Sequence, residues 1–317
     1  MPESSSLKRA LILLHPRKIF IPFNSADHMA QLKDYIELTK PKQTFLLLLT
    51  SIFAYLTNVK SISFAGAVHL VASMLLSISG TTAMNMALEA DIDSLMRRTS
   101  SRPIPQGRLT PLEGMTFGIV LFASGLSVSL LINIYVAIAI ILGLISDIFL
   151  YTLWLKRRNP MSIVLGGIAG GAPALAGWAA SSGGIDLQGV LMAITVMLWI
   201  PAHIWYIAIY YKEDYEVAGI PMLPVSHGVK QTVKAIIIAL SILAAVELTM
   251  FAMKMFGLVF LILSLPFTLL LLYKSVIYLK DLSKEGARRM YKMASPLIGI
   301  IFMAMFIDNM IRIFLLS

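Results

Sequence analysis

The chain has 317 residues, of which 58% are hydrophobic and only 14% are charged. A soluble domain carries about a quarter charged residues, so this composition and a mean hydropathy of +0.81 indicate a protein embedded in a lipid bilayer. The absence of cysteine excludes disulfides, thiolate catalysis and cysteine-ligated metals. The formal charge of +9 does not indicate a nucleic-acid partner, because Lys and Arg lie in short loops between apolar segments, as membrane orientation signals do.

The first 42 residues are predicted to form an N-terminal cytoplasmic extension. Within it, Leu7–Phe23 is basic and apolar but is interrupted by Pro16 and Pro22. This stretch is either an ordinary tail, a short targeting segment or a helix lying in the membrane interface.

Residues 43–317 are predicted to form one all-α, polytopic membrane domain. A spanning helix needs roughly 20 apolar residues, and about nine such helices are expected around a central apolar cavity. The third and fourth windows are separated only by Asn133–Tyr135, so eight spans are the alternative. The windows are 43–59, 64–84, 115–134, 136–155, 162–181, 188–210, 233–252, 255–273 and 294–315.

The distribution of Lys and Arg supports nine spans. With that number, all of the 26 basic residues except Lys60, Lys254 and Arg312 fall on the side of the N-terminus. Basic residues are enriched on the cytoplasmic side of membrane proteins. The sequence therefore predicts a cytoplasmic or matrix-side N-terminus. We expect the protein to lie in a prokaryotic cell membrane, with the site loops on the cytoplasmic side.

A first acidic motif lies at the end of the second span, in NMALEADIDSLMRR. If the helix continues, Asn85, Glu89, Asp93 and Arg97 are spaced by four residues and share one stripe, whereas Asp91 lies on the opposite face. Carboxylates so close together repel one another and are costly near lipid. We therefore expect a positive partner for this stripe.

Mg²⁺ is the predicted partner, because it binds one or two carboxylates and completes its shell with water and phosphate oxygens. The following Arg97, Arg98 and Arg102 supply planar donors suited to phosphate. Together these residues predict a metal–diphosphate site. The alternative is a solvated loop in which the acids simply pair with the arginines.

A second acidic motif ends the sixth span. Trp199, His203, Tyr206, Tyr210 and Asp214 fall within about 80° of one helical face. The face runs from an aromatic interior containing a histidine to a carboxylate at the membrane surface. The alternatives are an interfacial tyrosine belt and a histidine that only hydrogen-bonds a neighbouring helix.

The two motifs are separated by an even number of crossings, so they lie on the same face of the membrane. Lys212 would add a further phosphate donor there, and Lys156–Arg158 reach the same face. The two motifs can therefore close over a single diphosphate. Asp147 and Glu247 lie within spans, where charges mark functional sites by default, and they are the features that would favour a transporter.

These motifs together resemble the UbiA superfamily of intramembrane prenyltransferases, and most closely its haem-farnesylating branch. Two departures from the branch pattern are Glu89, where Asp is usual, and Ala202, where Pro is more common. The resemblance extends from the first span to just before the seventh. The segments that carry it are ELTKP (37–41), NMALEADID (85–93), MRRTSSRP (96–103), YTLWLKRRNP (151–160), WIPAHIW (199–205) and DYEVAGIPMLPV (214–225).

The resemblance implies transfer of a farnesyl group from farnesyl diphosphate to a vinyl group of haem B, giving haem O, with Mg²⁺ as the metal. The motif positions then imply a role for each candidate residue. The implied reaction also suggests haem-handling or oxidase-assembly proteins as partners. The alternative is prenylation of a quinone-precursor ring. Metal and diphosphate would be bound by Asn85, Glu89, Asp93 and Asp214, diphosphate charge by Arg97, Arg98, Arg102 and Lys212, and the acceptor by His203 and Tyr206.

Overall fold

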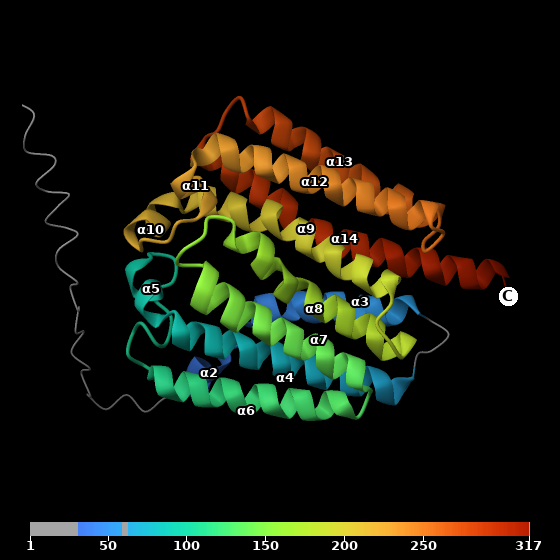
Figure 1. The fold of residues 1–317 in the computed structure, drawn as a ribbon, viewed down its shortest axis with the longest axis horizontal. Coiled ribbons are helices and arrows are strands. Elements are labelled where there is room, and N and C mark those ends of the chain that lie inside the picture. The colour runs from blue at the N-terminus through green and yellow to red at the C-terminus, as the bar shows by residue number, and fades with distance from the viewer. Residues whose placement is uncertain (1–30, 59–62, 317) are drawn as a thin grey trace, which may run out of the picture.

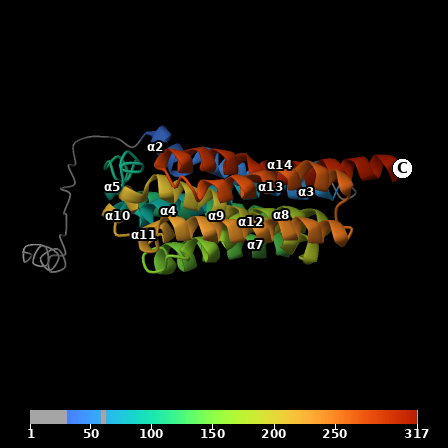
Figure 2. The ribbon, with the colours of Figure 1, turned by 90° about the horizontal axis from the view of Figure 1, so that it is seen from above.

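The computed structural model describes residues 31–58 and 63–316, and all the regular structure in them is helical. Figure 1 shows the long helices running side by side from one end of a bundle to the other, and Figure 2 shows the same alignment from above. The segment Leu7–Phe23 lies outside the described residues. The all-helical membrane fold is confirmed.

The long helices follow the predicted apolar windows. They are, in chain order, α3 (Pro41–Thr57), α4 (Phe64–Leu88), α6 (Pro111–Leu130), α7 (Ile134–Leu144) continued by the π-helix η2 (Ile145–Leu155), α8 (Ser162–Ser182), α9 (Leu187–Tyr210), α12 (Gly228–Ala252), α13 (Leu258–Tyr278) and α14 (Lys284–Leu316).

Eight of these helices are long and apolar enough to cross a membrane, if α7 and η2 are taken as one. The remaining window, 43–59, is occupied by α3, whose 17 residues lie at the short end of the range for spanning helices. The alternative that merged residues 115–155 into one span is wrong. Asn133 accepts a hydrogen bond from the Val136 amide at 3.0 Å, so a new helix starts there.

Small residues allow the helices to approach closely. In α8, a side-chain carbon at Gly171 would meet the Ala193 carbonyl of α9, and one at Gly177 would overlap the Ser51 backbone of α3. In the same way Gly80 of α4 lies directly against the backbone of α6. Such contacts are typical of membrane helix packing.

A buried acid joins two helices far from either motif. Glu247 of α12 is fully buried and accepts hydrogen bonds from Ser264 and Thr268 of α13, at 2.9 and 2.6 Å. Both carboxylate oxygens are therefore satisfied inside the bundle, as buried polar groups require. These hydrogen bonds account for the buried carboxylate of Glu247, which connects α12 to α13.

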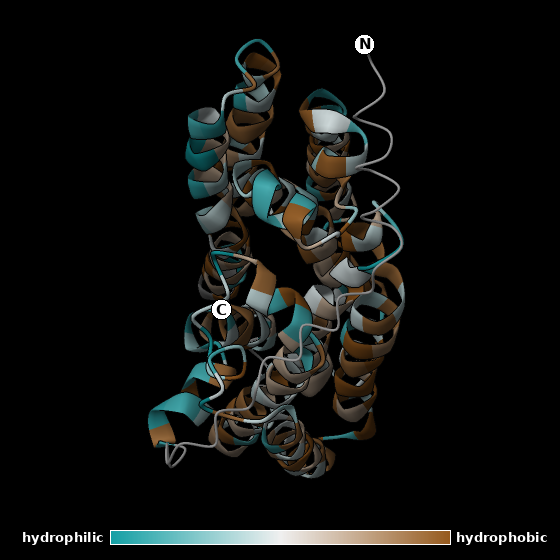
Figure 3. Ribbon diagram, turned by 90° about the vertical axis from the view of Figure 1, so that its left-hand side faces the viewer, coloured by the Kyte–Doolittle hydropathy of each residue, from teal (hydrophilic) through white to brown (hydrophobic). Residues whose placement is uncertain are grey.

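The short helices gather at one end of the bundle, at the left of Figure 1. Figure 3 views this end directly and shows hydrophilic loops in front of apolar helices. The even number of crossings between the two motifs correctly predicted that they share this end. The short helices are α2 (Leu32–Leu38), α5 (Ala90–Leu95), α10 (Lys212–Val217) and α11 (Leu223–Ser226).

Candidate functional site

The first acidic motif forms a buried stripe at the end of α4. The Glu89 amide donates to the Asn85 carbonyl at 3.0 Å, and the Asp93 amide donates to the Glu89 carbonyl at 2.8 Å. Helical spacing therefore persists from α4 into α5, and Asn85, Glu89 and Asp93 are only 7%, 3% and 3% exposed. Asp91 points outward, as predicted. The helix ends at Leu95, so the extension of the stripe to Arg97 is wrong, and Arg97 lies exposed in the following loop.

A different cation contacts each member of this stripe. Lys156 pairs with Glu89 and Arg102 with Asp93, both at 2.5 Å. The Lys40 ammonium donates to the Asn85 side-chain oxygen at 3.0 Å. The cations come from three separate segments, which the fold brings together. Pairing of acids with arginines, the alternative considered above, is therefore realised for Asp93, but the partners of Asn85 and Glu89 are lysines.

Lys40 and Thr152 were missed by the sequence analysis as parts of the site. Thr152 accepts a hydrogen bond from the Asn85 amide group at 2.8 Å. Lys40 precedes Pro41 at the start of α3 and adopts a left-handed conformation, with φ of 44°. Lys40 could have been identified from its place in the sequence, because its ammonium lies directly before a span, at the same membrane face as both motifs.

The π-helix η2 positions Lys156. The Lys156 amide donates to the carbonyl of Tyr151, five residues earlier, at 2.8 Å, which is the π-helical pattern. The wider turn places the Lys156 ammonium 5.6 Å from the Tyr151 ring centroid, a cation–π contact. Tyr151 therefore supports the lysine that contacts Glu89.

The pKa values in this cluster follow from burial and pairing. Burial opposes ionisation of Glu89, but Lys156 and Lys40 outweigh it and hold the Glu89 pKa below its usual value. Burial also opposes the charge on Lys156, yet Glu89 raises its pKa above the ordinary range. Burial, followed by repulsion from Arg102, lowers the pKa of Lys40 to about 8. The Glu89 carboxylate thus stays ionised at neutral pH, and the surroundings stabilise the charge of Lys40 less than that of Lys156.

The second motif meets the first through Asp214. α9 ends at Tyr210, and Asp214 lies in the separate helix α10, so the predicted continuous helical face ends at Tyr210. Asp214 is 8% exposed and accepts a hydrogen bond from the Arg98 backbone amide at 3.2 Å. The Arg98 guanidinium lies 5.7 Å from the ring centroid of Tyr211. The loop after α5 is therefore fastened to α10 by residues of both motifs.

The other predicted residues of the second motif lie apart from the acidic stripe. Tyr206 is fully buried and donates to the hydroxyl of Ser275 in α13 at 2.8 Å. His203 is half-buried, with its Nδ1 3.2 Å from the Ser295 hydroxyl of α14. Lys212 pairs with Glu216 at the surface, at 3.2 Å.

The oxygen donors of the stripe suit Mg²⁺ bound together with a phosphate ligand. In the part of the chain that the structure describes, no three His, Asp or Glu side chains are grouped closely enough to hold a metal alone. Mg²⁺ does not require such a cage, since one or two carboxylates suffice when water and phosphate supply the remaining ligands. Glu89 and Asp93, one turn apart and both buried, provide that number.

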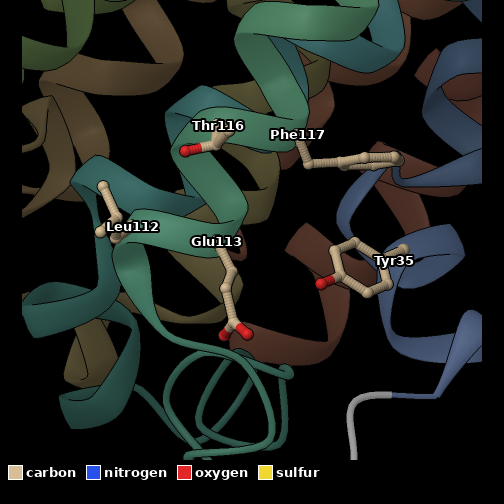
Figure 4. Close-up of a pocket in the computed structure, with 5 residues that line it drawn as sticks. All are labelled: Tyr35, Leu112, Glu113, Thr116 and Phe117. Carbon is tan, nitrogen blue, oxygen red and sulfur yellow. The ribbon is translucent and has the colours of Figure 1, made fainter.

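Two hollows open near this end of the bundle. One, of about 430 Å³, lies between α2 and α6 and is lined by Tyr35, Glu113 and Phe117 among others (Figure 4). It contains no cation and none of the predicted site residues. The second, of about 310 Å³, includes Tyr210, Lys212 and Lys284. Neither is the central apolar cavity expected from the sequence, which stays a prediction.

Comparison with known proteins identifies relatives along nearly the whole chain. Residues 46–305 match the profile of the UbiA prenyltransferase family. A protoheme IX farnesyltransferase of Korarchaeum cryptofilum is 51% identical over 89% of this chain and 96% of its own. A protein of the same name from Archaeoglobus fulgidus is 41% identical over 87% of this chain and 98% of its own.

Solved structures agree with the fold. A digeranylgeranylglyceryl phosphate synthase superposes with a TM-score of 0.73 at 23% identity, over 89% of this chain and 99% of the other. A UbiA homologue from Archaeoglobus fulgidus, bound to GPP and Mg²⁺, superposes with a TM-score of 0.62 at 17% identity, over 86% and 99% of the two chains. At these identities the likeness concerns the helical arrangement.

Proposed function

Because the chain belongs to the UbiA prenyltransferase family, we propose that it transfers the farnesyl group of farnesyl diphosphate to a vinyl group of haem B, forming haem O. The name of its 51% identical relative supports this donor and acceptor. The observation that carries the proposal is the buried stripe of Asn85, Glu89 and Asp93, contacted by Lys40, Lys156 and Arg102.

The stripe and its cations would bind the diphosphate. In this proposal Asn85, Glu89, Asp93 and Asp214 hold Mg²⁺ with the diphosphate oxygens, and the metal supplies Lewis-acid stabilisation of the leaving group. Further charge would be neutralised by basic side chains positioned before the reaction begins. These are the predicted Arg97, Arg98, Arg102 and Lys212, together with Lys40 and Lys156.

The reaction follows from this placement. The allylic carbon–oxygen bond breaks, and its electron pair leaves with the diphosphate. The terminal carbon of the haem vinyl group then attacks the allylic carbon, and water quenches the cation left beside the porphyrin, releasing a proton. Apolar helix walls would keep water from the allylic cation until the vinyl group has reacted. His203 and Tyr206 stay assigned to the acceptor side.

A membrane assay tests the acceptor. Membranes containing the protein are incubated with haem B and farnesyl diphosphate, and the haems are separated by chromatography. We expect haem O to appear at the expense of haem B. An unchanged haem B peak, with prenylated hydroxybenzoate formed in a parallel incubation, would instead establish the quinone-precursor reaction.

Substitutions separate the enzyme from a transporter. Asp93→Ala and Asp214→Ala are expected to abolish haem O formation, because each removes a carboxylate where the two motifs meet. Transport sites lie near the bilayer midplane, and Asp147 is the candidate there. If Asp147→Ala abolished activity while both other variants retained it, the site proposed here would be wrong.

A further inference from the structure

Two cations flank an aromatic ring beside the second motif. Lys284 and Arg288 lie one turn apart on α14 and are exposed. The Lys284 ammonium is 5.7 Å, and the Arg288 guanidinium 5.8 Å, from the ring centroid of Tyr210. Tyr210 precedes Asp214 by four residues, so this cationic cluster lies at the same end of the bundle as the acidic stripe.

The same two helices continue inward from these cations. Ser295 lies seven residues after Arg288, on the same side of α14, and its hydroxyl contacts His203 of α9 at 3.2 Å. The imidazole stacks on Trp199, with ring centroids 4.8 Å apart and planes 15° from parallel. The seam between α9 and α14 therefore changes from cationic at the surface to polar and then aromatic in the interior.

An aromatic connection joins the cationic cluster to the loop of the first motif. The rings of Tyr210 and Tyr211 meet edge to face at 4.7 Å, and the Arg98 guanidinium lies 5.7 Å from the Tyr211 ring centroid. Arg98 in turn donates its backbone amide to Asp214. The cluster thus adjoins the proposed diphosphate site.

We propose that Arg288 and Lys284 bind the carboxylates of the acceptor, a tetrapyrrole with two propionate groups, and hold its ring over the α9–α14 seam toward His203. This proposal rests on the proposed function. A porphyrin is flat and apolar, with its propionates grouped on one edge, which matches a seam with cations at the surface end and with His203 and Trp199 further inward. Guanidinium groups bind carboxylates through paired hydrogen bonds.

The existing partners of the two cations leave them able to bind. Lys284 has one ion pair, with the exposed Glu213 at 3.5 Å, and such surface pairs are worth about 0–1 kcal/mol. Arg288 forms no ion pair with any residue of 31–58 or 63–316. Its neighbour Arg289 instead pairs with Asp281 at 3.7 Å, which makes Arg289 a matched control.

Haem titration of the full-length protein tests the proposal. The protein is placed in phosphatidylcholine nanodiscs without farnesyl diphosphate, and binding of haem B is followed by absorbance. Loss of a charged hydrogen bond should raise the Kd of Arg288→Gln about 10-fold. Arg289→Gln should bind as the wild type does. Haem B dimethyl ester, which lacks free carboxylates, should bind wild type and Arg288→Gln equally.

Each contrary result overturns the proposal. An equal loss of affinity for haem B and its dimethyl ester would show a structural effect of Arg288→Gln. An equal loss of haem affinity in Arg289→Gln would show an effect of overall charge. The titration is repeated in nanodiscs that contain anionic lipid, and a loss of affinity confined to these would show a headgroup site.

Turnover separates this proposal from the proposed function. If the wild-type protein makes no haem O in the membrane assay, the proposed function is wrong, whatever the affinity of the protein for haem. If haem O is made, Arg288→Gln should raise the KM for haem B and leave the KM for farnesyl diphosphate unchanged. An unchanged KM for haem B would overturn the carboxylate site alone.

Discussion

The Glu89–Lys156 pair shows how a charged site is kept inside an apolar bundle. Both side chains are largely removed from solvent, and their charged atoms are 2.5 Å apart. Removing one partner of a buried pair leaves an uncompensated charge, which typically costs about 3–5 kcal/mol. Loss of either partner alone should therefore destabilise this end of the bundle, because the other charge would be left buried and unpaired.

Metal dependence is the first prediction at the scale of single residues. Chelation should abolish prenyl transfer, and added Mg²⁺ should restore it. If Glu89 is a metal ligand as proposed, Glu89→Gln removes its charge and should raise the Mg²⁺ concentration for half-maximal activity about 10-fold, which is equivalent to about 1.4 kcal/mol. Activity is measured across a Mg²⁺ titration.

Asp91→Asn is the control for Glu89→Gln. Asp91 points outward and pairs with Arg157 at 2.7 Å, so its loss should change the Mg²⁺ requirement less than twofold. Full activity in excess chelator would refute the role of the metal. Equal shifts in the two variants would refute the assignment of Glu89 as a ligand.

Among the helices packed against the acidic stripe, η2 contacts it through side chains. Its wide turns place Thr152 against Asn85 and Lys156 against Glu89. π-Helical segments occur frequently at functional sites. In this chain, η2 and the lysine that follows it contact two of the three members of the acidic stripe, Asn85 and Glu89.

Replacing Thr152 tests this role of η2. Thr152→Val keeps the shape but leaves the Asn85 amide without its acceptor. Because the amide then orients the diphosphate ligands less well, we expect the KM for farnesyl diphosphate to rise about 5- to 10-fold, as loss of one hydrogen bond implies. Steady-state kinetics over both substrates provides the measurement.

Thr195→Val supplies the comparison. Thr195 is also fully buried, but its hydroxyl donates to the Leu191 carbonyl of its own helix at 2.9 Å. Both variants should lower the thermal midpoint slightly, and only Thr152→Val should alter the KM. A KM change shared by both would indicate a general loosening of the bundle.

Helical periodicity made the acidic stripe predictable, because Asn85, Glu89 and Asp93 repeat every four residues and helical hydrogen bonds continue across Glu89, the residue between α4 and α5. The place where the helix ends was not predictable in the same way. Arg97 continues the numerical pattern, but the chain leaves the helix after Leu95. The same limit applies to Asp214, since a break at Tyr211 separates it from α9.

Contacts between distant segments were beyond the sequence alone. Lys40 and Thr152 are 45 and 67 residues from Asn85 in the chain, and only the packing of α3 and η2 against α4 brings them together. The π-helix adds a five-residue spacing that an α-helical analysis does not consider. Conversely, the shared face of both motifs needed only a count of crossings and was predicted correctly.

At the scale of the whole molecule, the two ends of the bundle differ in chemistry. The end with both motifs carries the short helices and most of the described basic residues, and Figure 3 shows that its loops are hydrophilic. We propose that this end faces the cytoplasm, because basic loops are retained on that side.

Cysteine labelling tests the orientation, and the chain has no cysteine of its own to interfere. Ser101→Cys lies in the loop after α5, and Met253→Cys lies after α12, at the other end; both side chains are exposed. In intact cells, an impermeant maleimide should label Met253→Cys and not Ser101→Cys. The reverse pattern would place the site outside the cell.

The pairing within the acidic stripe also affects how the product leaves. Lys40, Lys156 and Arg102, three of the cations that would hold the diphosphate, already have partners in the protein, so ligand binding would exchange one set of contacts for another. Part of the attraction to diphosphate is offset by the Glu89–Lys156 and Asp93–Arg102 pairs that it must replace. Once the bond to the prenyl chain is broken, those pairs can re-form and displace the free pyrophosphate. Because the charged side chains of the site are paired with one another when no ligand is bound, the site is protected from inhibition by its product.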